Sequence, residues 1–148
     1  MENIIRPFTE RIFSLLSFLR QTREEFELVS EEMDEDHLRL TLRAFAAETN
    51  QYEQELKSQL KMLEIKETPA ASFFNCDELL ENIHSIMNAS GIKEILDTCN
   101  ATESFFEKAY RNVLNEYFPY ESLRNMLVYQ LNGIKCTFMK MKLLNSVQ

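Results

Sequence analysis

The chain has 148 residues, among them only two glycines and three prolines, whereas ordinary proteins contain roughly 7% Gly and 5% Pro. Sandwiches, barrels and nucleotide-binding α/β folds need such residues at most turns, so the composition excludes them and favours a few long helices. The net charge of −8 argues against nucleic-acid partners and anionic membrane surfaces, which need surplus lysine and arginine. A chain of this length is expected to form one domain over residues 1–148.

The first half of the chain predicts two long helices. Apolar residues recur at three- and four-residue steps from Ile12 to Met33, which predicts a helix over 7–33 that Pro7 opens. The acidic cluster 34–36 interrupts this pattern. A similar stripe from Leu38 to Leu63 then predicts a second helix over 36–65.

The second half predicts a connection, a short helix and two more long helices. The short helix is expected over 77–88, with Leu80, Ile83 and Met87 on one side and a stop signal at 88–91. Helices are then predicted over 92–117 and 121–145, separated by a turn at Pro119. The expected fold is all-α: a four-helix bundle of two helical hairpins, joined by a crossover that carries the short helix.

Polar residues interrupt the apolar stripe of every long helix at a similar height in the predicted bundle. They are Thr22 and Arg23, Glu48 and Thr49, Thr102 and Glu103, and Gln130. One interpretation is a carboxylate metal site in the bundle core. The other is a satisfied polar layer that fixes helix register, in which Arg23 supplies positive charge in place of a metal.

Several short segments resemble an uncharacterised bacterial ferritin-like family, known mainly as a domain of unknown function. The segments are 24–26, 45–56, 95–103, 108–110 and 130–134. This resemblance implies a ferritin-like bundle, often dimeric and associated with metal or stress. Carried over by position, it implies metal ligands at Glu24, Glu48 and Glu103, with Gln130 in the fourth helix and iron or manganese as the metal.

Two positions depart from the ferritin-type pattern. Gln51 stands three residues after Glu48, where a histidine is expected, and Gly133 stands where the fourth helix would offer another ligand. A complete di-metal site needs about four Glu and two His. We therefore expect a non-catalytic bundle with a degenerate site and no bound cofactor. The alternatives are a di-iron or di-manganese carboxylate protein, and an acidic interaction module that uses residues 24–36.

Further signals concern surfaces and thiols. Phe13, Phe18, Val128 and Met139 lie away from their stripe centres, which predicts either a homodimer or partner helix, or more extensive burial within the bundle itself. Glu81 and His84 share one helical face as a possible ligand pair or a solvated one.

The cysteines and the first residues bear on location. Cys99 and Cys136 fall on or near apolar stripes, and we expect both to be buried and inert. The first residues lack the basic and apolar regions of a signal peptide, so a cytoplasmic protein with reduced thiols is expected.

Overall fold

The computed structural model describes residues 2–34, 36–67, 77–85 and 92–146, and within these ranges the secondary structure is entirely helical. The helices are α1 (Glu2–Glu32), α2 (Asp36–Met62), α3 (Asp77–Ser85), α4 (Ile92–Leu114) and α5 (Glu121–Ser146). This confirms the all-α prediction. In the described part of the chain, no helix combines the length and apolarity that crossing a bilayer requires.

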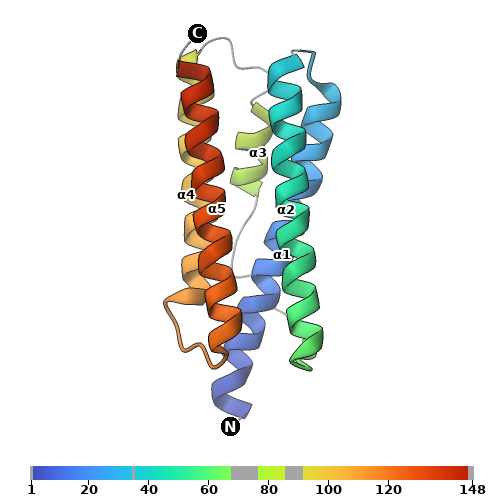
Figure 1. Ribbon diagram of the computed structural model, residues 1–148, viewed down its shortest axis with the longest axis vertical. Coiled ribbons are helices and arrows are strands. Elements are labelled where there is room, and N and C mark those ends of the chain that lie inside the picture. The colour runs from blue at the N-terminus through green and yellow to red at the C-terminus, as the bar shows by residue number, and fades with distance from the viewer. Residues whose placement is uncertain (1, 35, 68–76, 86–91, 147–148) are drawn as a thin grey trace.

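The four long helices lie side by side along one axis (Figure 1). Helices α1 and α5 run upward in that view, whereas α2 and α4 run downward. Helix α4 therefore begins at the end of the bundle where α2 also begins. The chain between α2 and α4 must cover the length of the bundle, and α3 lies on that route (Figure 1).

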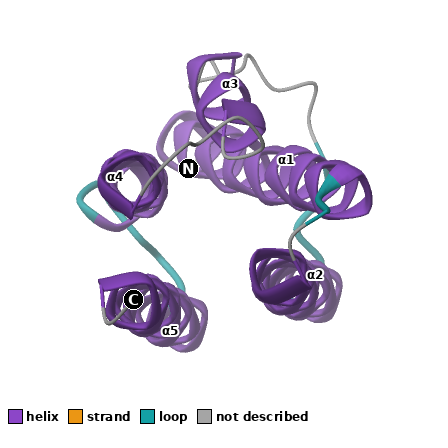
Figure 2. Ribbon diagram, turned by 90° about the horizontal axis from the view of Figure 1, so that it is seen from above, coloured by secondary structure: helices purple, strands orange, loops and turns teal. Residues whose placement is uncertain are grey.

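Packing follows the order of the hairpins. Helix α1 packs on α2 and on α4, and α5 packs on α4 and on α2, so the long helices form a four-cornered ring (Figure 2). Helix α3 lies outside this ring against α1 and α4. It buries Leu79 and Ile83 completely, because these residues are four apart and share one face. The face formed by α2 and α5 lies on the opposite side from α3 (Figure 2).

An aromatic cluster joins all four long helices in the core. Phe45 of α2 lies 4.6 Å from Phe26 of α1, 5.5 Å from Phe106 of α4 and 4.9 Å from Phe138 of α5, measured between ring centroids. Phe18 joins at 5.0 Å from Phe106. Edge-to-face pairs of this kind add about 0.5–1.5 kcal/mol beyond their burial. Phe18 is therefore buried within the bundle, although it lies away from the stripe centre, because α4 covers that side of α1.

Pro7 does not open the first helix, contrary to the prediction. Helix α1 begins at Glu2 and contains Pro7 in its interior. Pro7 is the sixth residue of α1, beyond the first turn, so it removes one intrahelical bond, the one that an amide at this position would donate to the carbonyl of Asn3.

Helix α2 ends three residues earlier than predicted, in a Schellman motif. The amide of Ile65 donates to the carbonyl of Leu60 at 2.9 Å, and the amide of Glu64 donates to Lys61 at 3.1 Å. Glu64 has a φ of 57°, the left-handed conformation that glycine normally supplies. Because no glycine marks this position, the sequence pattern extended the helix too far.

The ends of α3 and α4 also differ from the prediction. Helix α3 is described only to Ser85, so Met87 and the stop signal at 88–91 lie outside the described residues. Helix α4 ends at Leu114 rather than 117, and the guanidinium of Arg124 donates to the Leu114 carbonyl at 2.7 Å. This side chain from α5 satisfies a terminal carbonyl and stabilises the end of α4.

Candidate functional site: a buried polar layer

Four of the seven polar interruptions of the stripes are buried, and the other three, Arg23, Glu48 and Glu103, are half-buried. Thr22, Thr49, Thr102 and Gln130 are each at most 1% exposed. Each threonine hydroxyl donates to the carbonyl four residues earlier in its own helix, at 2.7–2.9 Å. The three threonines therefore need no partner from another helix.

Gln130 of α5 links three helices. Its amide oxygen accepts from the hydroxyl of Tyr110 on α4 at 2.8 Å. Its amide nitrogen donates to the Tyr52 carbonyl at 3.3 Å and to the Glu55 carboxylate at 3.1 Å, both on α2. Both ends of this buried amide are thus used inside the protein, which fixes the register between α5 and its neighbours.

Glu48 lies at the junction of α2 and α5. The hydroxyl of Tyr52 donates to one of its carboxylate oxygens at 2.6 Å, and the hydroxyl of Thr137 donates to the other. Burial and the neighbouring Glu48 raise the pKa of Tyr52, so this phenol remains a protonated donor. Gly133 lies against the hydroxyl end of Tyr52, and a methyl group at Gly133 would overlap that hydroxyl. Gly133 of α5 therefore packs closely against α2.

Arg23 has a partner that the sequence analysis missed. Its Nε donates at 3.0 Å to Glu53, whose side chain is 1% exposed, and its Nη1 donates to Glu27 at 3.2 Å. Lys57 lies 3.0 Å from the other Glu53 oxygen. Arg23 therefore neutralises a carboxylate between α1 and α2. It does not face the predicted ligands of the other helices.

Opposing effects act on the pKa of Glu53. Burial alone would raise it, but hydrogen bonds and charges from Lys57 and Arg23 outweigh burial and hold it below its usual value. In the same way, Glu53 and Glu27 overcome burial and raise the pKa of Arg23. This pair is consequently ionised at neutral pH.

The other two predicted ligands lie apart from this group. Glu103 is bound by the ammonium of Lys142 at 2.6 Å, and the same ammonium donates to Asn100 at 3.0 Å. Glu24 has a side chain that is 59% exposed, and its carboxylate lies 4.0 Å from Arg23.

The ligands implied by the family resemblance therefore occupy separate environments. Gln51 is exposed and donates to Glu55 at 3.2 Å, away from the core. Among the described residues, no three or more His, Cys, Asp or Glu side chains are grouped so that they could hold a metal ion.

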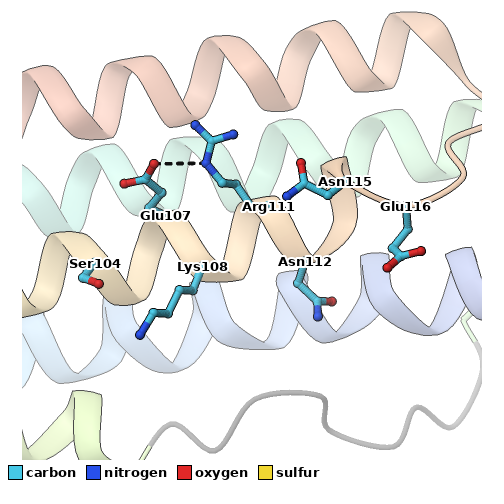
Figure 3. Close-up of a pocket in the computed structure, with 7 residues that line it drawn as sticks. All are labelled: Ser104, Glu107, Lys108, Arg111, Asn112, Asn115 and Glu116. Carbon is cyan, nitrogen blue, oxygen red and sulfur yellow. Dashed lines mark hydrogen bonds and ion pairs between the residues drawn. The ribbon is translucent and has the colours of Figure 1, made fainter.

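A shallow depression of about 570 Å³ follows α4 (Figure 3). It is lined by side chains from successive turns of α4 and the residues after it: Ser104, Glu107, Lys108, Arg111, Asn112, Asn115 and Glu116. Arg111 pairs with Glu107 at 3.0 Å, and Lys135 of α5 pairs with the same carboxylate at 3.2 Å. The charges of this depression are thus largely paired along one surface, without convergent groups that would bind and activate a substrate.

A second depression, of about 350 Å³, lies between α1 and α3 and contains the predicted pair Glu81 and His84. Here Nδ1 of His84 lies 3.4 Å from the carboxylate of Glu25 on α1. The histidine therefore helps to attach α3 to the bundle.

The two described cysteines differ from each other. Cys99 is buried, and burial raises the pKa of its thiol to about 11, which suppresses the reactive thiolate. Cys136 is exposed on α5, contrary to the expectation that it is buried. The apolar stripe of α5 faces the core, and Cys136 lies on the other side of that helix.

Comparisons with known proteins identified no relative. No protein-family model matches the sequence, and no match was found among curated proteins or solved structures.

Proposed function

We propose that this protein is a non-catalytic, ferritin-like helical bundle whose polar layer stabilises the fold and whose biological role is carried by its outer surfaces. Its function would be that of a binding or scaffold protein. The metal positions of a ferritin-type ancestor would have been replaced by hydrogen-bonded side chains.

The direction of the helices supports the ferritin-like part of this proposal. Two antiparallel hairpins are connected so that α2 and α4 run the same way, and the connection between them covers the length of the bundle (Figure 1). Ferritin-like folds differ from simple up-down bundles in having one such long crossover.

The observation that carries the proposal is the internal pairing of the polar layer. Glu48 is held by Tyr52 and Thr137, Glu103 by Lys142, and Gln130 by groups at both ends of its amide. A metal would have to displace these donors from the carboxylates. A layer with satisfied partners instead contributes register and specificity, as buried polar groups do in other helical assemblies.

Metal analysis separates this proposal from a di-iron or di-manganese protein. The purified protein is loaded with Fe(II) or with Mn(II) without oxygen, desalted and analysed for metal content. We expect well under one metal per chain, with the same content in Glu48→Ala and Glu103→Ala. One or more metals per chain that are lost in both variants would overturn the proposal.

The same variants test the structural role by a second readout. We expect Glu48→Ala to lower the free energy of unfolding by about 1–3 kcal/mol, because it leaves the buried Tyr52 hydroxyl without its acceptor. Glu24→Ala is the matched control, since its carboxylate is exposed. Its effect should remain within about 0.5 kcal/mol.

A further inference from the structure

The outer rows of α2 and α5 form one nearly uncharged surface, which we call the α2–α5 face. All its members are exposed. On α2 they are Leu40, Ala44, Ala47, Gln51, Ser58 and Met62; on α5 they are Asn125, Val128, Tyr129, Asn132, Cys136, Met139, Lys140 and Leu143. In a chain with 27% charged residues, Lys140 is the only charged residue among these fourteen. Two carboxylates lie on the same rows: Glu55, which accepts from Gln51, and Glu121, four residues before Asn125.

Exposed apolar side chains concentrate on this face. Among the described residues, eight large hydrophobic side chains are exposed, and six of them belong to the α2–α5 face. Tyr129 is 70% exposed and Leu143 is 57% exposed. The other lysines near the middle and end of α5, Lys135 and Lys142, instead point to α4, where they pair with Glu107 and Glu103. A contiguous uncharged surface of this kind is typical of a protein–protein interface.

The order of residues on α5 identifies a second copy of the chain as the partner. In a two-fold symmetric pair, if residue i of the first copy contacts residue j of the second, then residue j of the first copy also contacts residue i of the second. If two α5 helices pack antiparallel with Cys136 at the axis, Tyr129 lies opposite Leu143 of the other copy, and Asn132 lies opposite Lys140. The two lysines therefore face asparagines rather than each other, and apolar groups meet at both ends.

Charge favours the same arrangement, and the length of α5 sets its extent. Two copies that each carry a net charge of −8 repel one another, so they associate best through a surface that lacks charge. Helices α2 and α5 have 27 and 26 residues, which makes each about 40 Å long and 10 Å wide. With the axis at Cys136, the two α5 helices cover each other over roughly 400 Å² per partner, the size of a weak and reversible interface, and α2 lies at its edge.

We propose that the protein forms a two-fold symmetric homodimer through the α2–α5 face, with the α5 helices antiparallel and Cys136 at the axis. This inference concerns a surface and does not depend on whether the polar layer binds metal. It also gives the exposed thiol of Cys136 a defined neighbour, namely the same thiol in the partner.

Sedimentation of single and paired charge variants tests the interface and its register. Tyr129→Lys and Leu143→Glu should each raise the dimer dissociation constant at least about tenfold. The double variant Tyr129→Lys/Leu143→Glu should regain much of the lost affinity, because the two new charges meet across the antiparallel interface. Leu28→Glu, at an exposed apolar position on α1, is the matched control and should leave the dissociation constant unchanged.

Chemical cross-linking provides an independent measurement. A short bismaleimide, which adds one thiol to each of its two ends, should convert the wild-type protein to a covalent dimer, whereas Cys136→Ser should form no covalent dimer. Circular dichroism of each variant verifies that it is folded. A wild-type protein that is monomeric at all working concentrations overturns the proposal. So does a dimer that Leu143→Glu does not weaken, or a double variant no tighter than either single variant.

Discussion

Gly133 offers a sharp test of the packing between α2 and α5. Glycine in a helix interior is normally unfavourable, so Gly133→Ala would be expected to stabilise α5 by about 1 kcal/mol on helix propensity alone. The structure predicts the opposite sign. A methyl group at this position overlaps the hydroxyl of Tyr52, and it would lie 3.3 Å from Cζ of the same ring and 3.4 Å from Oε2 of Glu48.

The expected magnitude follows from what must move. Tyr52 is 5% exposed, so its ring has little room to withdraw, and overpacking of this kind costs about 1–3 kcal/mol. If the ring turns away instead, the hydrogen bond to the Glu48 carboxylate is lost, which costs about 1.5–3 kcal/mol. After the gain in helix propensity, we expect Gly133→Ala to destabilise the protein by about 1–2 kcal/mol.

The assay is a double-mutant cycle with Tyr52→Phe, followed by urea unfolding and circular dichroism. Removal of the hydroxyl leaves the 3.3 Å contact with the ring carbon, which a small ring movement relieves, and the 3.4 Å contact with Oε2 of Glu48, which is an ordinary van der Waals distance. In the Tyr52→Phe background, Gly133→Ala should therefore be neutral or stabilising by up to about 1 kcal/mol. Equal stabilisation by Gly133→Ala in both backgrounds would refute the close contact. Thermal midpoints should follow, at about 2–4 °C per kcal/mol for a chain of this size.

Three further substitutions test other parts of the fold. Glu64→Gly should raise the free energy of unfolding by about 0.5–1 kcal/mol in urea titrations, because Glu64 holds a left-handed conformation at the end of α2; a loss of stability would contradict that geometry. Glu53→Gln should change the pH dependence of unfolding. Because hydrogen bonds from Lys57 and Arg23 lower the pKa of Glu53 despite its burial, its ionised form stabilises the folded state above its ordinary pKa of 4.5, and this contribution is lost as the pH falls below 4.5. The wild type should therefore lose stability faster than Glu53→Gln below pH 4.5, and parallel profiles would disprove the pairing. Gln130→Leu should cost about 1–3 kcal/mol in the same titrations, because it leaves the buried Tyr110 hydroxyl without an acceptor. Failure of an added Tyr110→Phe to recover any of this loss would contradict the assigned bond.

The sequence alone was sufficient for the long helices of the fold and for four of the polar residues that face inward. Long stripes with a period near 3.6 predicted every long helix, since a helix that buries one face must repeat its apolar residues in that way. The burial of Thr22, Thr49, Thr102 and Gln130 followed from the same angular argument. The end of α2 was misplaced because Glu64 adopts a conformation that sequence rules reserve for glycine.

The partners of the polar residues could not be predicted in this way. A helical wheel gives the direction of a side chain but not the depth to which a long side chain reaches across an interface. Glu53 was missed because it lies at the flank of the stripe, toward α1. The sequence did contain one indication that Glu53 is buried. Glu53 is seven residues after the apolar Ala46 and so lies on the same side of α2, and Arg23, which faces inward, required a carboxylate partner. The burial of Phe18 could not be decided for a similar reason, because one helix cannot show which neighbour covers its second face.

Thr137 connects the polar layer with the proposed dimer. It follows Cys136 in the sequence and donates to Glu48, which in turn follows Ala47 of the α2–α5 face. A dimer that covers this face removes water from the edge of the Glu48 carboxylate, so each protein donor to it becomes more important.

Thr137→Val keeps the shape of the side chain but removes its hydroxyl. We therefore expect it to raise the dimer dissociation constant by about tenfold, which corresponds to roughly 1.4 kcal/mol. Thr98→Val removes a hydroxyl that donates within α4 to the Glu94 carbonyl, away from the α2–α5 face, and serves as the control. Sedimentation equilibrium measures both variants. If Thr137→Val and Thr98→Val leave dimer affinity equally unchanged, the buried carboxylate and the interface are energetically independent.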